Sequence, residues 1–269
     1  MILQFASFSF DASICELFAP LVAGGTVCIP SEEERIEDLE GVMQRLSVTD
    51  ASLTPAIAAS LRPEALPTLK HLYIGGEAPT AAIVSTWADK VRLSNICGLT
   101  EGGVWDTVDL NLQPTDNPKT IGRGIGSICW IVDPDNIHRL QPIGVEGEVL
   151  LQSPYLAHKF LDDTAQNNKA FLSLPESFST LTGPFPARCY RTGDLARWQP
   201  DGKMIFTGRR AGFVKIRGLR VELGEIENAI RDCLPSGRQA AVTLARDETG
   251  LNSPELVVLW NNMMGDLHC

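Results

Sequence analysis

The sequence predicts an α/β fold in three parts: a parallel-sheet α/β subdomain, a β-barrel-like subdomain and an incomplete small α+β C-terminal domain. The first part alternates strand-like apolar runs with helical patterns, which is typical of a parallel sheet covered by helices. From Thr120 onward, short strands and turns containing Pro or Gly replace this alternation, as in antiparallel barrels and sandwiches. We expect the three parts at residues 1–118, 119–210 and 211–269.

The opening residues predict a strand that leads into a helix. The helical pattern runs from Ala12 to Leu21, and its expected buried face is formed by Ile14, Leu17 and Phe18. Asp11 stands where an N-cap residue would accept backbone N–H bonds. In a second interpretation it is a carboxylate facing a cleft, where it would bind a substrate ammonium. From the residue pattern alone we favour the cap.

The first part continues the alternation. A second helix is expected over residues 31–46, opened by Ser31 and Glu34 at capping-box spacing. The further expected elements are strands at 26–29, 51–54, 69–74 and 91–96 and helices at 56–61 and 79–90. The pair Gly75-Gly76 and the run 97–103 each follow a predicted strand. Because ligands of parallel sheets bind outside the carboxyl ends of the strands, both turns are candidate ligand contacts.

The turn at 97–103 carries the more informative side chains. The Thr100 hydroxyl can contact phosphate oxygens, and the Glu101 carboxylate can contact a Mg²⁺ ion. The neighbouring glycines let the backbone approach a ligand closely. The alternative interpretation is a glycine-rich surface turn that happens to contain Thr-Glu.

The stretch 190–227 concentrates an acid, several basic side chains and glycines. Asp194 is expected in a tight Thr-Gly-Asp turn, followed by a strand at 204–207. A carboxylate beside a basic cluster suggests a polyanionic, sugar-bearing ligand such as a nucleotide. The other expected elements of these parts are strands at 127–132, 147–152, 238–245 and 255–260, helices at 157–169 and 224–234, and a surface loop at 173–186.

The composition is that of a soluble globular protein from a reducing compartment. Hydrophobic residues make up 44% and charged residues 21% of the 269 residues, as in ordinary globular chains. The net charge of -10 disfavours a nucleic-acid or membrane-surface partner. The seven cysteines lie singly, and no apolar stretch approaches a membrane span. We therefore expect a cytoplasmic protein without a disulfide framework or zinc site.

Several segments, read in order, resemble one family. They are FSFDASICELF at 8–18, NICGLTEGGVW at 95–105, GEVLLQSPYLAHKFLDD at 147–163, YRTGDLARW at 190–198 and GRRAGFVKIRGLRVELGEIE at 208–227. Together they resemble the adenylation domain of nonribosomal peptide synthetases, within the adenylate-forming (AMP-binding) ligases. The segment at 121–144 is similar to the fungal branch. The resemblance covers essentially the whole chain.

The resemblance implies an enzyme that activates a carboxylic acid. Such domains use Mg-ATP to form an acyl-AMP and release pyrophosphate, and then pass the acyl group to the phosphopantetheine thiol of a carrier domain. The implied cofactors are ATP and Mg²⁺. The implied partners are an amino-acid substrate and the carrier (thiolation) and condensation domains of a larger synthetase of secondary metabolism.

The resemblance also implies roles for individual residues. Asp194 would accept hydrogen bonds from both ribose hydroxyls, and Arg209 would reach the nucleotide near its ribose or phosphate. Thr100 would contact the phosphate and Glu101 would bind Mg²⁺, both as catalytic residues. The remaining implied nucleotide contacts are Gly75, Gly76 and Cys97. The thiol of the last stands where the family usually stacks a tyrosine on adenine, so a π-face is lost.

By the same resemblance, Asp11 would bind the substrate α-amino group, a role that can coexist with capping. The substrate side-chain pocket would be formed by mostly apolar residues, namely Ala12, Cys15, Ser52, Tyr73, Gly75, Ile96, Val104 and Trp105. Because Trp105 takes up volume and no pocket residue offers a counter-charge, we expect a small or medium uncharged amino acid. Ordinary core packing is the alternative interpretation of each pocket residue beyond Asp11.

Three departures from the family bear on activity. The family's glycine-rich phosphate loop precedes the segment at 8–18, its C-terminal lysine lies beyond the last residue of this chain, and its hinge aspartate is Ala211 here. Because a fixed cation contributes strongly to such catalysis, we expect the isolated chain to be inactive or weak. The alternatives are a noncatalytic relic that binds a nucleotide or a protein, and a free-standing acyl- or aryl-acid ligase. Asp11 argues against the ligase, since its buried carboxylate would lack a partner there.

Overall fold

The computed structural model describes residues 1–161, 163–181, 186–210, 213–216, 219–222, 226, 229–230, 233–234, 240–245, 255–261 and 267–268. The chain forms two compact units, Met1–Gly208 and Arg209–Cys269. The three-part division expected from the sequence stays a prediction. Nearly all candidate site residues belong to the first unit.

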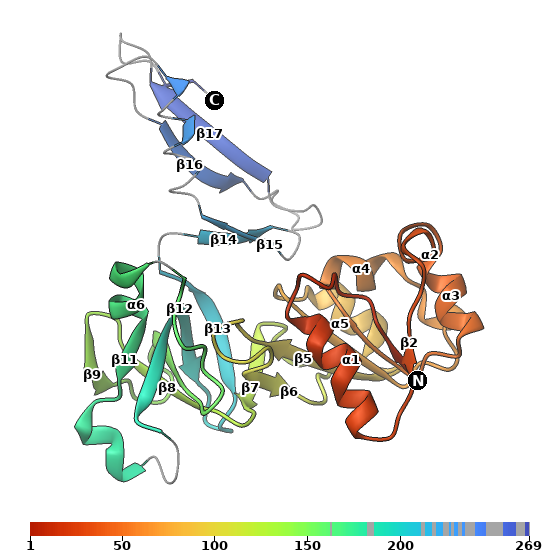
Figure 1. The fold of residues 1–269 in the computed structure, drawn as a ribbon, viewed down its shortest axis with the longest axis horizontal. Helices are drawn as coiled ribbons and strands as arrows, with labels where there is room; N and C mark the ends of the chain where they lie inside the picture. Colours follow the sequence, from red (N-terminus) through yellow and green to blue (C-terminus); the bar gives the residue numbers. More distant parts are fainter. Residues whose placement is uncertain are drawn as a thin grey trace. The chain divides into compact units, whose positions relative to one another are not determined.

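A parallel sheet forms the N-terminal half of the first unit (Figure 1). Its strands follow the order β2-β1-β3-β4-β5, and each neighbouring pair is parallel. The strands are β1 (Ile2–Leu3), β2 (Val27–Cys28), β3 (Asp50–Leu53), β4 (His71–Gly75) and β5 (Arg92–Cys97). The helices are α1 (Ala12–Val22), α2 (Glu32–Glu37), α3 (Leu39–Arg45), α4 (Pro55–Ser60) and α5 (Ala81–Trp87), with a 3₁₀ turn at Pro63–Ala65. These crossovers confirm the predicted α/β class.

Polar side chains begin the helices. Ser31 and Glu34 form the predicted capping box at the start of α2. The single helix expected over 31–46 is nevertheless two helices, because the backbone at Asp38 leaves the helical region with φ of −144°. The Asp38 carboxylate accepts the N–H of Gly41 at 3.0 Å and so begins α3. An aspartate side chain can cap a new helix, so an aspartate in the middle of a helical sequence pattern can divide it into two helices.

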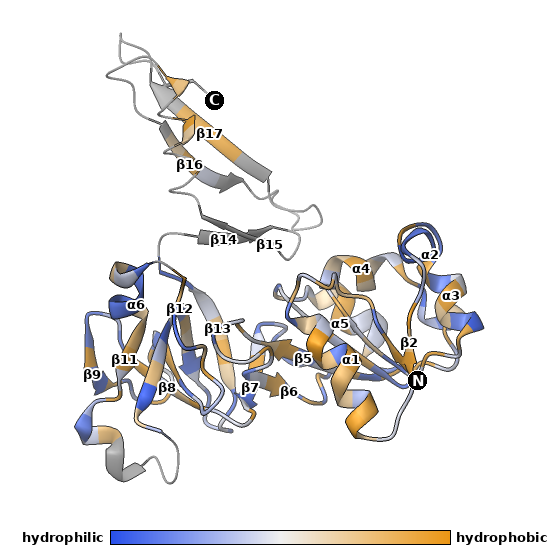
Figure 2. Ribbon diagram, in the orientation of Figure 1, coloured by the Kyte–Doolittle hydropathy of each residue, from blue (hydrophilic) through white to orange (hydrophobic). Residues whose placement is uncertain are grey.

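Helix α1 faces the opposite way from the expectation. Ile14 and Phe18, predicted to be buried, are 54% and 61% exposed, whereas Leu17 is half-buried. The buried side chains of α1 include Glu16, whose carboxylate accepts the backbone N–H groups of residues 5–6 at 2.9 Å each. With Glu16 anchored inward, apolar side chains of α1 such as Leu21 and Val22 are left exposed, on a helix that is coloured as largely hydrophobic in Figure 2.

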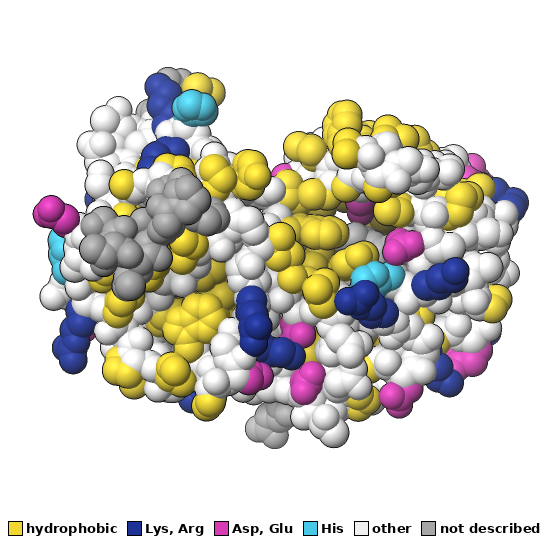
Figure 3. Space-filling view, turned by 90° about the horizontal axis from the view of Figure 1, so that it is seen from below, with side chains coloured by type: hydrophobic (Ala, Val, Ile, Leu, Met, Phe, Trp, Pro, Cys, Tyr) yellow, Lys and Arg dark blue, Asp and Glu magenta, His cyan; other side chains and the backbone are white. Residues whose placement is uncertain are grey.

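One face of the parallel sheet carries the core. Leu53, Leu72 and Ile74 are at most 3% exposed and share a buried cluster with Trp87 of α5. The Trp87 indole N–H donates to the Ala58 carbonyl at 3.1 Å and so joins α5 to α4. The alternate strand residues are only half-buried, namely Asp50, Ser52, His71 and Tyr73. Figure 3 shows one face of the molecule on which apolar side chains gather in a hollow, with a histidine and charged side chains beside it.

Antiparallel strands extend the large sheet beyond β5. The order continues as β6-β7-β13-β12-β10-β8-β9, with β11 paired to β12. The strands are β6 (Thr107–Asp109), β7 (Thr120–Gly124), β8 (Ile128–Asp133), β9 (Asn136–Leu140), β10 (Gly147–Gln152), β11 (Phe171–Ser173), β12 (Arg188–Trp198) and β13 (Met204–Arg209), with α6 at Thr164–Ala170 and a 3₁₀ turn at Glu176–Leu181. They confirm the short antiparallel strands predicted after Thr120.

Asp194 lies within β12 and not in the tight turn that was expected. The strand runs through Thr-Gly-Asp because Gly193 adopts φ of +72°. The pairing with β10 shifts register between Glu148 and Leu150, opposite this point. Such an irregularity re-aims a side chain without ending the strand.

The second unit contains a hairpin and a small sheet. Strand β14 (Phe213–Ile216) pairs antiparallel with β15 (Leu219–Glu222), and β17 (Glu255–Asn261) pairs antiparallel with β16 (Ala240–Ala245) and β18 (Leu267–His268). The strands predicted at 238–245 and 255–260 are confirmed. The hinge position Ala211 lies outside the described residues, as does most of the helix predicted at 224–234. Among the helices described, none is long and apolar enough to cross a membrane.

Replacement of Trp87 by Phe tests the contact between α4 and α5. The variant keeps an aromatic ring but leaves the Ala58 carbonyl without its indole donor, which should lower the free energy of unfolding by about 1–3 kcal/mol. Urea denaturation measures the difference. Val22→Ala is the control, because Val22 is 88% exposed and its change should stay within about 0.5 kcal/mol. Equal effects of the two substitutions would contradict the prediction.

Candidate functional site

The predicted ligand turns lie at the carboxyl ends of β4 and β5. Gly75 ends β4, and a Cβ there would lie 2.6 Å from Ile96 Cγ1 and 2.7 Å from the Ile96 carbonyl oxygen. Gly76 follows with φ of +87°, a conformation that glycine adopts without strain. The close approach of β4 to β5 therefore requires glycine at position 75. Strand β5 ends at Cys97, next to the second turn.

Asp106 holds the loop that follows Cys97. The Asp106 N–H donates to the Cys97 carbonyl at 2.9 Å, and the Asp106 carboxyl accepts the Leu99 N–H at 2.9 Å. The backbone passes close to this carboxyl at Gly102, where a Cβ would lie 2.2 Å from Oδ1. Val104, a predicted pocket residue, has φ of +93°, which β-branched residues rarely adopt. The loop is thus folded tightly around one acid.

Thr100 and Asp11 are in direct contact. Thr100 Oγ1 donates to Asp11 Oδ2 at 2.7 Å. Asp11 occupies the N-cap position of α1, but in the described part of the chain its carboxylate makes no capping bond. The side-chain cap favoured by the residue pattern is therefore wrong. Because a threonine hydroxyl has a single proton, Thr100 cannot donate to Asp11 and to a phosphate at the same time.

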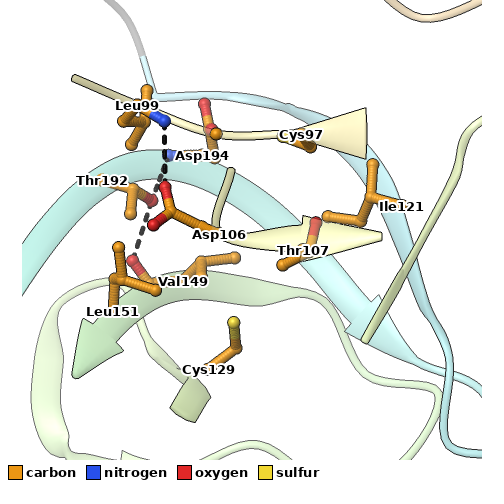
Figure 4. Close-up of a pocket in the computed structure, with 11 residues that line it drawn as sticks. Cys97, Leu99, Asp106, Thr107, Ile121, Cys129, Val149, Leu151, Thr192 and Asp194 are labelled. Carbon is orange, nitrogen blue, oxygen red and sulfur yellow. Dashed lines mark hydrogen bonds between the residues drawn. The ribbon is translucent and has the colours of Figure 1, made fainter. Parts of the chain in front are cut away.

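A cavity opens between the end of β5 and the antiparallel strands (Figure 4). Cys97 and Asp106 line it from the loop side, and Thr192 and Asp194 line it from β12. The Asp194 N–H donates to Thr192 Oγ1 at 3.0 Å, and this hydroxyl donates to the Val149 carbonyl at 2.8 Å. Asp194 is 5% exposed. These bonds fix the backbone of β12 at Asp194, whose side chain lines the cavity.

The electrostatics of the site are acidic. Burial raises the pKa of Asp106 to about 7, against the opposing effect of the Leu99 N–H bond. The carboxylates of Asp11, Glu101 and Asp194 raise the pKa of Asp106 further. Asp106 is therefore largely protonated below neutral pH, and its carboxyl then adds no negative charge to the site.

Glu101 offers the site a carboxylate for a cation. Among the described residues, no group of three or more His, Cys, Asp and Glu side chains could hold a metal ion by itself. Magnesium is commonly bound by one or two carboxylates, with waters and phosphate oxygens in the remaining positions. The residues present therefore fit a magnesium ion that arrives together with a phosphate ligand.

The sheet brings several of the predicted pocket residues together. Ser52 and Tyr73 are register partners on β3 and β4, and Gly75 and Ile96 are register partners on β4 and β5. The ring centroids of Tyr73 and Trp105 lie 5.3 Å apart, with an angle of 32° between the planes. Strands β3, β4 and β5 and the loop after β5 thus carry one small polar residue, one glycine, one aliphatic residue and two aromatic rings.

The remaining predicted residues lie on other elements. Ala12 and Cys15 are half-buried near the start of α1, and burial raises the pKa of the Cys15 thiol. Arg209 is the first residue of the second unit, and Ala211 lies outside the described residues. The binding roles given to all of these residues stay predictions.

Three polar residues near the site were missed by the sequence reasoning: Glu16, His71 and Asp106. Glu16 is a charged residue inside an apolar helix pattern, and Asp106 is an acid just after a glycine-rich turn. Both patterns are visible in the sequence and could have identified these two residues. His71 carries no such signal, because a histidine at the start of an alternating strand is ordinary.

The fold and the site define an α/β protein in which turns at the edge of a parallel sheet face an aspartate on adjoining antiparallel strands. Residues 1–161 match the family model described as "AMP-binding enzyme". Since this match covers more than half of the chain, the protein belongs to the AMP-binding enzyme family, as the motifs predicted.

Known relatives are larger than this chain. It is 45% identical over 230 residues to Nonribosomal peptide synthetase 4 of Gibberella zeae, a match that covers 84% of this chain and 3% of that protein. Its fold resembles that of an NRPS protein containing adenylation and PCP domains, with a TM-score of 0.81, 24% identity and coverage of 99% and 46% of the two chains. It also resembles a four-domain nonribosomal peptide synthetase bound to AMP and glycine, with a TM-score of 0.66, 30% identity and coverage of 96% and 19%.

The stability of the first unit should fall as the pH rises from 5 to 7. Burial raises the pKa of Glu16 from 4.5 and of Asp106 from 3.8, in each case to about 7. Between the ordinary and the raised pKa the folded state binds more protons than the unfolded state, so each carboxyl lowers the free energy of unfolding by up to about 1.4 kcal/mol per pH unit. Above pH 7 the slope should level off.

Chemical denaturation at a series of pH values measures this slope. Glu16→Gln removes one titrating group and should make the slope shallower. Glu33→Gln, on the exposed side of α2, is the matched control and should leave the slope unchanged. A stability that rises between pH 5 and 7 would show that these carboxyls do not titrate as described.

Proposed function

We propose that this chain forms part of an adenylation domain that activates an amino acid with Mg-ATP, giving an aminoacyl-AMP and pyrophosphate. The observation that carries the proposal is the 2.7 Å contact between Thr100 Oγ1 and Asp11 Oδ2. It joins the residue expected at the phosphate to the residue expected at the substrate ammonium. Membership of the AMP-binding enzyme family supports the proposal, as does the similar solved synthetase bound to AMP and glycine.

In this proposal Asp11 binds and orients the amino acid. Its carboxylate would pair with the α-ammonium group, and Thr100 would then turn its hydroxyl from Asp11 to a phosphate oxygen. The two substrates would thus be held side by side, which lowers the entropic cost of bringing them together. Asp194 would accept hydrogen bonds from the ribose hydroxyls, and Arg209 would contact the nucleotide near its ribose or phosphate.

Glu101 would hold the magnesium ion that accompanies ATP. When bound, the ion neutralises charge that develops on the phosphate groups. Glu101 is 9% exposed, and at such a site the attraction between a carboxylate and a cation is stronger than in water. Thr100 and Glu101 are therefore the proposed catalytic residues.

The adenine would lie near Gly75, Gly76 and Cys97. The glycines let the backbone approach the base, but a thiol at position 97 offers no aromatic ring for stacking. This feature favours a second candidate function, a noncatalytic domain that binds a nucleotide or a protein partner. A free-standing acyl- or aryl-acid ligase is less favoured, because its substrate has no ammonium group for Asp11.

We further propose that the aminoacyl group passes to the phosphopantetheine thiol of a carrier domain, in a synthetase that also has condensation domains. The solved NRPS protein with the similar fold contains adenylation and PCP domains. The proposed substrate is a small or medium uncharged amino acid, since Trp105 packs against Tyr73 in the pocket. None of the cysteines in the described part of the chain is in a disulfide, which fits the proposed cytoplasmic location.

Asp11→Asn in the full-length protein tests the substrate site. The variant keeps the shape of the side chain but loses the charge that pairs with the ammonium. The KM for the amino acid should rise about 10- to 100-fold, while the KM for ATP should change little. Amino-acid-dependent exchange of pyrophosphate into ATP measures both constants. Asp89→Asn, at an exposed position after α5, is the control, and an unchanged amino-acid KM in Asp11→Asn would refute the role of Asp11.

Cys97→Tyr tests the adenine site by a gain of affinity. A tyrosine ring would supply the missing stacking surface, worth about 0.5–1.5 kcal/mol, so ATP should bind about 2- to 10-fold more tightly. Calorimetry with ATP measures the affinity. The same substitution at the exposed Cys233 controls for a nonspecific effect of the new ring. Binding that is lost or unchanged in Cys97→Tyr would place the adenine elsewhere.

A further inference from the structure

Three aromatic rings form a cluster on the half-buried face of the parallel sheet. His71 and Tyr73 lie two residues apart on β4, with ring centroids 4.2 Å apart and 30° between the planes. The centroid of the Trp105 ring, from the loop after β5, lies 5.3 Å from that of Tyr73. Tyr73 and Trp105 belong to the proposed substrate pocket, whereas His71 belongs to none of the recognised segments.

A hydrogen bond to Ser94 orients the His71 ring. Ser94 Oγ donates its single proton to the Leu110 carbonyl at 3.0 Å, so it accepts from His71 Nε2, which lies 3.0 Å away. On the other side of the ring, Asp50 Oδ1 lies 3.9 Å from His71 Nδ1. Burial lowers the pKa of His71, and so does Arg92, against the opposing effect of Asp50. The imidazole is therefore neutral near pH 7 and held in one orientation.

We propose that His71 is a positioning residue that sets the depth of the amino-acid pocket by holding the Tyr73 ring against Trp105. This proposal rests on the proposed function, since it assigns substrate selectivity to the same pocket. It identifies the preferred substrates as amino acids whose uncharged side chains end at the Tyr73 ring.

Tyr73 needs this support because it is only half-buried. A ring with two aromatic neighbours has few accessible rotamers, whereas loss of the His71 ring frees Tyr73 to move away from Trp105. The space vacated by Tyr73 would then admit a larger substrate side chain. One aromatic pair changes an equilibrium by about 2- to 10-fold, and the selectivity should shift by a similar factor.

Two variants of the full-length protein separate the ring from its hydrogen bonds. His71→Ala removes the ring, whereas His71→Phe keeps a ring beside Tyr73 and loses the contact with Ser94. His138→Ala makes the same truncation on the exposed strand β9 and serves as the control. The quantity measured is the ratio of kcat/KM for phenylalanine to kcat/KM for alanine in pyrophosphate exchange.

We expect His71→Ala to raise this ratio about 2- to 10-fold through KM, with kcat for the preferred substrate nearly unchanged. His71→Phe should restore most of the original ratio, and His138→Ala should leave it unaltered. A ratio that is the same in His71→Ala and in the unmodified protein overturns the proposal. A fall in kcat alone, equal for both substrates, overturns it too, because it would show a general structural role.

A ligand-free measurement distinguishes failure of this proposal from failure of the proposed function. Trp105→Phe should alter the near-ultraviolet circular dichroism, and this difference spectrum should shrink in the His71→Ala background if His71 holds the Tyr73–Trp105 pair. An unchanged difference spectrum overturns the role of His71. If the spectrum changes but the unmodified protein activates no amino acid, the proposed function fails, and the selectivity role of His71 fails with it.

Discussion

The hydrogen bond from the Leu99 N–H to the Asp106 carboxyl fixes the loop on which the candidate site depends. A glycine-rich loop without such an anchor has many conformations of similar energy. Closed around Asp106, the loop places Thr100 against Asp11 and Trp105 against Tyr73. Burial of an acid is costly, and protonation of Asp106 near pH 7 keeps that cost low. The contacts of Thr100 and of Trp105 thus both depend on the loop that Asp106 holds.

Glu16 anchors the segment before Asp11 in the same way. Its carboxylate holds the two N–H groups of residues 5–6, while the Arg35 guanidinium donates to the Phe5 carbonyl at 3.0 Å. Glu16 therefore lies on the inward side of α1, where it satisfies backbone N–H groups that need hydrogen-bond partners. Each side of the Asp11–Thr100 contact is therefore held by one buried carboxyl.

The parts of the fold that local patterns specify could be predicted from the sequence. Strand and helix alternation, the capping box at Ser31 and Glu34, and the glycine turns after β4 and β5 all follow from neighbouring residues. Three features could not be predicted from local patterns: the interruption at Asp38, the inverted face of α1 and the course of β12 through Asp194. Each depends on a partner that is distant in the chain or on a choice between two local hydrogen bonds. The contacts around His71 could not be predicted for the same reason, because strand register brings Ser94 and the loop of Trp105 close to β4.

Charge gives the strongest physical reason to read these contacts as a binding site and not as core packing. The carboxylates of Asp11, Glu101 and Asp194 each lie close enough to Asp106 to raise its pKa. A protein gains no stability from such an arrangement. In the proposed function each of these acids meets a complementary ligand group: an ammonium group for Asp11, a magnesium ion for Glu101 and ribose hydroxyl donors for Asp194. A positively charged ligand group bound beside these acids would offset part of the cost of holding them close together, and this differential free energy would favour binding.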